Sequence, residues 1–377
     1  MTPVRPAASA SPVTRSAAEW DAFVEGNVLG SYLQLPAWAQ VKAANGWTAR
    51  RIGANGPDGR VGAQLLLRRP RPLPWSFAYA PRGPVADAWT PGSVDAFTAA
   101  LRAAGTSLGH VSHVRIDPEV ERDGPLDPDG SLRAALARAG WRPAPRIQPP
   151  TTRLIDLRAD EAALWGDLRK KWRQYVNKAR SGGVSVTELA GDPIAPFYAI
   201  YRETAARAGF LIRTEQAYRD IWAAFAPAGR ARLLFAVDAT GMPQAALFLV
   251  RCGSRVVEPY GGMTLTGGEL RANYLLKWEA IRRSREEGAA TYDLWGLAHP
   301  GIAHFKTGFG GREVAYVGAW DLVLSPLGRV VYERGQAARV RWARARAGLG
   351  PGAADGAAGG GLNGGLNGGG DAGGEAG

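Results

Sequence analysis

Two lysines stand in sequence settings that could support group-transfer chemistry. Lys306 follows Phe305 within His304–Gly311, a segment rich in aromatic residues and glycine. An ammonium among such residues suits a phosphate, or an oxygen on which negative charge develops during a reaction. Lys42 follows Trp38 on a segment with helical apolar spacing. On spacing alone, a solvated surface lysine is the simpler interpretation at both positions.

Three other polar positions lie where the chain leaves a predicted element. The segment Tyr79–Pro84 runs from a strand into a loop of glycine and proline, where binding side chains such as Arg82 often lie. A packed turn with an exposed arginine explains this segment equally well. Asp117 ends a predicted strand and could act as a base, although an ion pair with Arg115 is the commoner outcome. Arg213 could hold a phosphate or a carboxylate.

The strongest charge pattern lies in residues 161–181, where apolar spacing predicts a helix that ends at Gly182. Between positions 169 and 180 this helix has no acid and carries the cations Arg169, Lys170, Lys171, Arg173, Lys178 and Arg180. Like charges one turn apart repel, and a phosphate-bearing partner would relieve that repulsion and release counterions. The pattern therefore favours a polyanion contact over a solvated face, and it does not indicate a catalytic site.

Length and composition limit the number of domains, the class of protein and the kind of partner. At roughly 150 residues per domain, 377 residues predict two domains. The chain is 46% hydrophobic and 21% charged, which excludes a wholly disordered protein. The 46 Lys and Arg exceed the 34 Asp and Glu, and this net charge of +12 favours an anionic partner.

Several classes of protein are not supported by the sequence. A single cysteine, Cys252, excludes a disulfide framework and a cysteine-based zinc site, and the four histidines lack metal-ligand spacing. We therefore expect no metal and no cofactor. There is no signal-peptide pattern and no apolar run of about 18 residues, so we expect a cytoplasmic protein. Motifs of hydrolases, kinases and dehydrogenases are missing.

Two blocks of predicted elements follow a similar plan between a Pro/Ala/Ser-rich lead-in, residues 1–13, and a glycine-rich tail, residues 348–377. The second block is predicted to contain strands 231–237, 244–251 and 255–260, helix 270–287, and strands 291–294 and 314–323. Each block runs from antiparallel strands through a helix to further strands. We therefore expect an α+β fold with mixed, mainly antiparallel sheets, used twice.

Taken in order, a set of short segments resembles one family, the FemABX peptidoglycan-bridge aminoacyltransferases. The resemblance covers about residues 20–335 and rests on the order of the set. The segments are Ser31–Trp38 with Lys42, Tyr79–Pro84, Arg115–Pro118, Lys171–Arg173, Phe197–Arg213, Tyr260–Gly262, Tyr292–Gly296 and Phe305–Gly311.

This resemblance implies two tandem domains like the Gcn5-related N-acetyltransferase (GNAT) fold, with a short basic helical insertion. The first domain would combine residues 14–150 with about 320–347. The second would span 151–319 and include helix 161–181. The implied partners are aminoacyl-tRNA and a peptidoglycan precursor, and DNA is not among them.

The implied reaction moves glycine, alanine or serine from tRNA to the stem-peptide side-chain amine of UDP-MurNAc-pentapeptide or lipid II. A peripheral contact with the membrane surface is compatible with the lipid-linked acceptor. The donor is an activated ester, so the reaction needs no ATP.

Residue roles follow from the same resemblance. Lys42 and Arg213 match positions that hold the diphosphate of the precursor. Phe305 and Lys306 match the pair that faces the aminoacyl end of tRNA, where Lys306 would stabilise an oxyanion. Asp117 matches an acid near the acceptor, although the family is often described as substrate-assisted.

Further positions are implied to contact the substrates. Tyr79, Arg82 and Tyr260 would contact the precursor, and helix cations Arg169, Lys170, Lys171, Arg173 and Lys178 would contact tRNA. One departure concerns precursor recognition, because Ser112 stands where a family member places a substrate-contacting tyrosine.

Two alternatives belong to other functional classes. An acetyl-CoA-dependent N-acetyltransferase would need a glycine-rich pyrophosphate loop near residues 264–271, where an RxxGxG cradle is missing and Glu269 would repel the anion. A non-catalytic RNA-binding module would keep the basic helix and have no use for Lys306. A further variant keeps the tRNA donor but modifies a protein N-terminus or a small metabolite.

Overall fold

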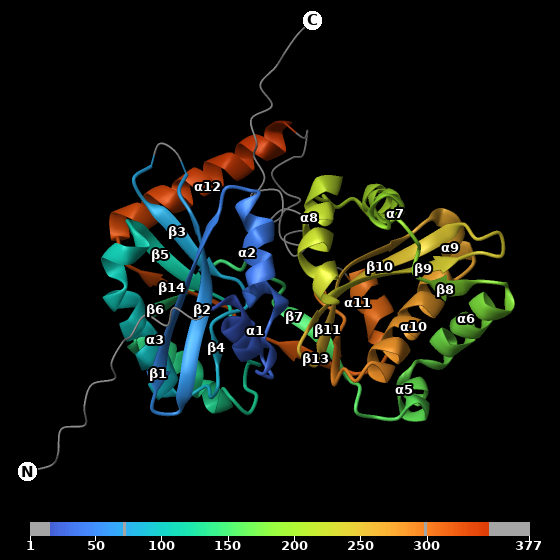
Figure 1. The fold of residues 1–377 in the computed structure, drawn as a ribbon, viewed down its shortest axis with the longest axis horizontal. Coiled ribbons are helices and arrows are strands. Elements are labelled where there is room, and N and C mark those ends of the chain that lie inside the picture. Colours follow the sequence, from blue (N-terminus) through green and yellow to red (C-terminus); the bar gives the residue numbers. More distant parts are fainter. Residues whose placement is uncertain (1–15, 71–72, 298–299, 347–377) are drawn as a thin grey trace, which may run out of the picture. The chain divides into compact units, whose positions relative to one another are not determined.

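The computed structural model describes residues 16–70, 73–297 and 300–346. Within these ranges the chain divides into two compact units, one up to Pro150 and again from Ala315, the other from Thr151 to Val314. Figure 1 shows a sheet with flanking helices in each unit. The predicted lead-in, residues 1–13, and the predicted tail, residues 348–377, lie outside the described residues.

The sheet of the first unit is antiparallel except where β3 pairs with β5. Its strands, in spatial order, are β1 (Thr48–Gly56), β2 (Gly59–Arg68), β3 (Ser76–Ala80), β5 (Val111–Ile116), β14 (Ala319–Val323) and β6 (Trp141–Ala144), and β4 (Val85–Ala86) pairs with β2. Strand β14 therefore reaches this sheet after the chain has formed the second unit.

Helices of the first unit begin where capping chemistry favours a start. Ser16 and Glu19 form a capping box at α1, and Thr90 caps α3 ahead of Pro91. Phe97 and Leu101 of α3 pack in the core against the sheet. The helices are α1 (Ala17–Glu25), α2 (Pro36–Ala43), α3 (Pro91–Ala103), α4 (Ser131–Arg138) and α12 (Pro326–Arg346), with 3₁₀ turns at Tyr32–Gln34, Gly105–Leu108 and Pro128–Gly130.

The second unit repeats the plan. Its sheet has a parallel pair, β11 with β12, and β12 is flanked on its other side by the antiparallel β7. The order is β13 (Arg312–Ala315), β7 (Thr151–Asp156), β12 (Thr291–Asp293), β11 (Arg255–Met263), β10 (Pro243–Cys252), β9 (Ala231–Val237) and β8 (Ser185–Thr187).

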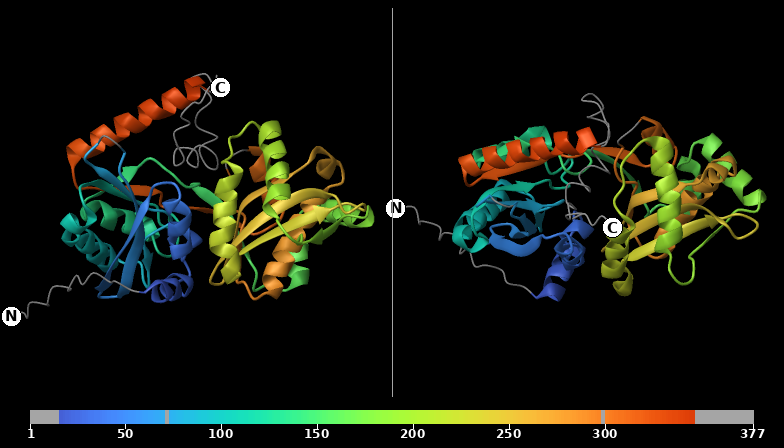
Figure 2. Two further views of the ribbon diagram at one scale, coloured as in Figure 1. Left: turned by 45° about the horizontal axis from the view of Figure 1, so that its top comes forward. Right: turned by 90° about the horizontal axis from the view of Figure 1, so that it is seen from above.

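Helices cover both faces of this second sheet, as the two views of Figure 2 show. Strand β10 is buried on both faces because alternate side chains point in opposite directions: Leu247 packs with α10, and Phe248 packs with Phe197 of α7. The helices are α5 (Glu161–Asp167), α6 (Lys170–Ser181), α7 (Ile194–Ala208), α8 (Glu215–Phe225), α9 (Leu265–Glu269), α10 (Ala272–Glu286) and α11 (Pro300–Thr307), with a 3₁₀ turn at Ala226–Ala228. The predicted α+β fold with mixed, mainly antiparallel sheets is confirmed.

The predicted continuous helix 161–181 is wrong in one respect. The chain is extended at Leu168 (ψ 138°), so it forms α5 and α6 instead. Two contacts with one distant segment hold this break: the Arg169 amide donates to the Gly308 carbonyl, and the Asp167 carboxylate accepts from the Gly311 amide. Tertiary bonds thus replace local helical ones.

The predicted helix 270–287 is confirmed as α10, which Arg271, with a φ of 60° in the left-handed region, separates from the short helix α9. One other predicted element is divided. The predicted strand 314–323 belongs to two sheets, because the chain leaves β13 and turns at Gly318 (φ 90°) before β14. The Phe305-Lys306 pair lies on helix α11.

Candidate functional site

The parallel strands of the second unit diverge at a defined point. Their register runs from Arg255 opposite Thr291 to Val257 opposite Asp293. Beyond Val257, strand β11 continues along β10, whereas the chain after Asp293 turns at Trp295, whose φ is 57°. Backbone carbonyls of this turn are therefore available to other groups.

Lys306 binds those carbonyls. Its half-buried side chain donates from Nζ to the Gly296 carbonyl at 2.9 Å and to the Trp295 carbonyl at 3.3 Å. Burial lowers the pKa of Lys306 to about 8; nearby Lys277 adds to this, and the charges of Glu258 and Asp293 oppose it. The ammonium is thus fixed in direction and, near neutral pH, remains largely protonated.

A buried ion pair supports the helix that carries Lys306. Lys277 of α10 binds Glu258 of β11, and the Tyr292 hydroxyl donates to the same carboxylate at 2.8 Å. The Lys277 ammonium also lies 5.5 Å and 5.8 Å from the ring centres of Phe305 and Phe309. Burial lowers the pKa of Lys277, while the attraction of Glu258 raises it. The pair therefore fixes the aromatic side of α11.

Asp293 holds the turn that Lys306 contacts. This fully buried carboxylate accepts from the Thr152 hydroxyl and the Arg255 guanidinium, and from the Trp295 amide at 2.8 Å. The Trp295 carbonyl in turn accepts from Lys306. A continuous set of polar contacts thus joins the strand ends to the lysine.

Helix α6 is anchored beside α11. The Trp172 indole donates to the Phe305 carbonyl at 3.0 Å, and a guanidinium nitrogen of Arg169 lies 3.3 Å from His304 Nδ1. The structure therefore brings the start of the predicted polyanion helix next to the Phe305-Lys306 pair, although the two segments are 135 residues apart in the sequence.

The cations of α6 fall into two groups. Lys170, Lys171 and Lys178 are exposed, and within the described part of the chain no carboxylate lies at ion-pair distance from them. Arg173 is half-buried and donates to the Gly166 carbonyl at 2.7 Å, so it caps the end of α5. Arg180 pairs with Glu279 of α10 at 3.3 Å. The exposed lysines remain the better candidates for a polyanion contact.

Arg213 and Tyr260 meet in an aromatic cluster of the second unit. Tyr218 lies 5.2 Å from Tyr260 between ring centres, and its hydroxyl accepts from the Arg213 amide at 3.3 Å. Burial raises the pKa of Tyr218 and of Tyr201, and the positive charge of Arg213 opposes both shifts. Arg213 thus lies beside a cluster of tyrosines that contact one another edge to face.

The first unit has its own parallel pair, β3 with β5, which ends at Ala80 and Ile116. Asp117 follows at once and is buried; its carboxylate accepts from the Tyr79 hydroxyl at 2.7 Å and from the Arg82 amide at 2.6 Å. Burial raises the pKa of Asp117 to about 6, against the attraction of Arg82 and these hydrogen bonds. The two units therefore place polar groups at equivalent strand ends.

The contacts of Arg115 and the burial of Arg82 differ from what the sequence suggested. The predicted Arg115–Asp117 ion pair is wrong, because Arg115 binds both carboxylate oxygens of Asp321 in β14 at 2.7 Å and 2.8 Å. Arg82 is buried, lies 3.3 Å from Glu119, and donates to the Pro149 carbonyl at 2.8 Å. The interpretation of Arg82 as an exposed arginine on a packed turn is therefore also wrong.

Lys42, in the last turn of α2, is buried with 6% of its surface exposed. Its ammonium lies 4.9 Å from the ring centre of Trp38, one turn earlier. The interpretation of Lys42 as a solvated surface lysine is therefore wrong. Ser112, the departure noted above, is buried and donates to the Ser76 carbonyl at 3.1 Å.

Comparisons with known proteins agree with this doubled architecture. The FemAB family matches residues 15–124, and the acetyltransferase (GNAT) domain matches residues 166–307. Residues 15–124 are thus similar to the FemAB family, and residues 166–307 to the GNAT domain. A crystal structure of FemX superimposes with a TM-score of 0.75 at 22% identity, covering 86% of this chain and 99% of that one, which shows the tandem GNAT-like fold.

Two curated relatives of this chain carry the name lipid II:glycine glycyltransferase. The one from Staphylococcus saprophyticus is 31% identical over 219 residues, 56% of this chain and 52% of the relative. The one from Staphylococcus aureus strain MRSA252 is 30% identical over 221 residues, 57% of this chain and 52% of the relative. The chain thus spans about half the length of the curated relatives it matches.

Several groups of this site were not among the residues predicted from sequence. Glu258, Lys277 and Asp293 are buried and charged, and they organise the surroundings of Lys306. One signal was available: Lys277 interrupts a run of apolar residues from Leu275 to Trp278 on a predicted buried helix face. A lysine there must find a partner or shift its pKa.

Among residues 16–70, 73–297 and 300–346, no helix is both long and apolar enough to cross a bilayer. Nor do three or more His, Cys, Asp or Glu side chains gather there in a way that could hold a metal ion.

Proposed function

We propose that this chain transfers an aminoacyl group from aminoacyl-tRNA to an amine of a peptidoglycan precursor. The observation that carries the proposal is the oriented ammonium of Lys306, which lies beside the basic helix α6 at the divergence of β11 and β12. The printed activity of the curated relatives supports the reaction class and makes glycine the first donor to test.

The chemistry needs little from the protein beyond orientation and charge. The acceptor amine attacks the ester carbonyl, a C–N bond forms, and the C–O bond to the tRNA ribose breaks. One proton passes from the amine to the leaving ribose oxygen. An ammonium has three donors, and Lys306 uses two on backbone carbonyls, which leaves one N–H for the oxyanion or the leaving oxygen.

The two substrates are assigned to different surfaces. Charged tRNA would lie along Lys170, Lys171 and Lys178 of α6, with its 3′ end beside Phe305. Lys42 and Arg213 remain the candidates for the precursor diphosphate by the family resemblance, and Tyr260 for the acceptor. With lipid II as the acceptor, the chain would act at the cytoplasmic surface of the membrane.

A transfer assay tests this function. The full chain is incubated with tRNA charged with labelled glycine, alanine or serine and with either lipid II or UDP-MurNAc-pentapeptide, and an acetyl-CoA reaction runs in parallel. We expect label on the muropeptide from one charged tRNA and none from acetyl-CoA. Transfer from acetyl-CoA alone would identify an acetyltransferase, and this proposal would be wrong.

A further inference from the structure

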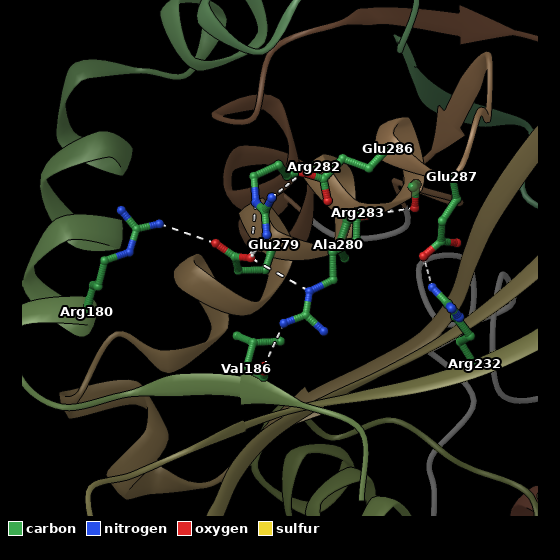
Figure 3. A network of polar contacts seen from close by, with 10 residues as sticks. Arg180, Val186, Arg232, Glu279, Ala280, Arg282, Arg283, Glu286 and Glu287 are labelled. Carbon is green, nitrogen blue, oxygen red and sulfur yellow. Dashed lines mark hydrogen bonds and ion pairs between the residues drawn. The ribbon is translucent and has the colours of Figure 1, made fainter.

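A second basic feature lies at the other end of α10, away from Lys306. A pocket of about 240 Å³ opens there between the end of this helix and strands β9 and β10. Its walls carry the arginines Arg230, Arg232, Arg251 and Arg283, and its floor includes Leu234 and Leu249. Figure 3 shows the polar contacts around it.

Two of the four arginine side chains, Arg251 and Arg283, are held in place by backbone carbonyls. Arg251 donates to the Gly253 carbonyl at 2.9 Å and to the Glu287 carbonyl at 3.2 Å. Arg283 donates to the Val186 carbonyl at 2.6 Å. Because a guanidinium has five N–H donors, these bonds fix its plane and leave further donors for a ligand. The pocket is therefore preorganised for a group with several acceptor oxygens.

Positive charge exceeds negative charge around the pocket. Glu287 is the single acid among its lining residues, and it pairs with Arg232, which also lies 3.7 Å from Glu188. Glu279 lies 3.7 Å from Arg283, but it also contacts Arg180 at 3.3 Å and Arg282 at 2.8 Å, and Arg282 pairs with Glu286 as well. One carboxylate is thus shared among three guanidinium groups, and a bound anion would reduce the remaining repulsion.

We propose that this arginine pocket is a phosphate-binding subsite that takes a backbone phosphate of RNA. The choice of RNA rests on the proposed function and on position: Glu279 links Arg283 of the pocket to Arg180 near the end of α6, so the pocket lies next to the helix that carries the exposed lysines (Figure 3). The volume suits a phosphate or a diphosphate and is below the range of about 300–1,000 Å³ that is typical of larger ligands.

Binding measurements on the full chain test the subsite. The double variant Arg232→Gln/Arg283→Gln is compared with Arg232→Lys/Arg283→Lys, which keeps the charge, and with Arg158→Gln, an exposed arginine elsewhere in the second unit that pairs with Asp156. The probes are inorganic pyrophosphate in calorimetry, and bulk unacylated tRNA in fluorescence anisotropy over a range of salt concentrations.

We expect the Gln variant to bind pyrophosphate and tRNA about tenfold or more weakly, with a shallower salt dependence for tRNA. The Lys variant should recover part of the affinity, and Arg158→Gln should match the wild type. If the wild type does not bind pyrophosphate, or the Gln variant binds it equally well, the subsite is wrong. If only pyrophosphate binding falls, the assignment to RNA is wrong. A failed transfer assay alongside both losses would reject the proposed function and leave the subsite standing.

Discussion

Burial acts on Lys306 and Asp117 in opposite directions because it disfavours the charged form of each. It lowers the pKa of Lys306 to about 8 and raises that of Asp117 to about 6. The lysine therefore loses its charge at a lower pH than an exposed lysine does, and the aspartate gains its charge at a higher pH than an exposed aspartate does. Each shift gives a pH dependence with a definite sign.

For Lys306 the dependence should appear in the transfer rate. If its ammonium offsets the developing oxyanion, kcat/KM should fall as the pH rises through about 8, because the proton is lost there. Lys306→Met should lower transfer by about 10²–10³-fold at pH 7. The measurement is a pH profile of single-turnover transfer, corrected for spontaneous hydrolysis of the ester.

Lys306→Arg is the matched control because it keeps the charge at every accessible pH. We expect it to retain part of the activity and to lose the decline near pH 8. A decline that persists unchanged in this variant would assign the titration to another group and contradict the role of Lys306.

For Asp117 the dependence should appear in stability. Its pKa in the folded state is above the ordinary value of 3.8, so the folded state binds the extra proton and stability falls as the pH rises from about 4 to about 7. A shift of this size corresponds to a loss on the order of 2–3 kcal/mol over the whole of that pH range. About 1–1.5 kcal/mol of it falls between pH 5 and pH 7.5, and urea denaturation of wild type and Asp117→Asn at these two pH values should show this smaller loss in wild type alone. The exposed Asp95→Asn on α3 should behave like wild type, and an equal loss in Asp117→Asn would contradict the assignment.

Sequence patterns located Lys42, Asp117 and Lys306 as candidates, but not their surroundings. The partner of Arg115 lies 206 residues later in the chain, at Asp321, so no local spacing could reveal it. The burial of Lys42 has the same origin, since helical spacing does not say what packs over the helix. Long-range contacts decided both.

At the scale of elements, α6 and the segment after α11 depend on one close approach. A Cβ at Gly308 would lie 2.3 Å from ring atoms of Trp172, which is itself buried and bonded to Phe305. Gly308→Ala should therefore destabilise the second unit by about 1–3 kcal/mol. Gly301→Ala on α11 is the control: nothing lies near its Cβ position, so it should be neutral or slightly stabilising in thermal and urea unfolding. Equal stability of the two variants would mean that α11 does not pack on Trp172 in this way.

The exposed lysines of α6 give a second prediction at this scale. The triple variant Lys170→Gln/Lys171→Gln/Lys178→Gln removes charge without removing buried contacts. If each lysine contacts one phosphate, the slope of log K against log salt for tRNA should decrease by about 2–3. Arg202→Gln on the exposed face of α7 should leave the slope unchanged. An unchanged slope in the triple variant would remove α6 from the tRNA surface.

The break between α5 and α6 shows that apolar periodicity predicts the buried face of a helix and does not predict where the helix ends. Leu164, Leu168 and Trp172 are all buried, as the apolar stripe predicts. The apolar stripe does not predict that Asp167 and Arg169 form hydrogen bonds with residues 308–311 in place of helical hydrogen bonds. Periodicity therefore identified the buried face, while tertiary hydrogen bonds set the helix ends.

At the scale of the whole molecule, the two sheets share one plan and differ in the source of one strand. In the first unit the strand beside the parallel pair is β14, which the chain contributes after completing the second unit; in the second unit it is β7, which the chain contributes at the start. The prediction of a single strand at 314–323 did not reveal that β14 joins the first sheet, because a strand pattern does not indicate which sheet the strand joins.

This arrangement predicts how the chain can be divided. Residues 151–314 contain every strand of the second sheet except the last residue of β13, and should unfold cooperatively when expressed alone. Residues 16–150 lack β14, which lies between β5 and β6 and carries the buried partner of Arg115, so they should not fold alone. Adding residues 315–346 through a short Gly-Ser linker after Pro150 should restore folding, because the Tyr316 amide donates to the Pro150 carbonyl at 3.0 Å and the two ends therefore already meet.

Urea unfolding followed by circular dichroism compares the three proteins. If residues 16–150 alone unfold as cooperatively, and at the same midpoint, as the linked form, β14 is dispensable and the first unit does not depend on its second segment.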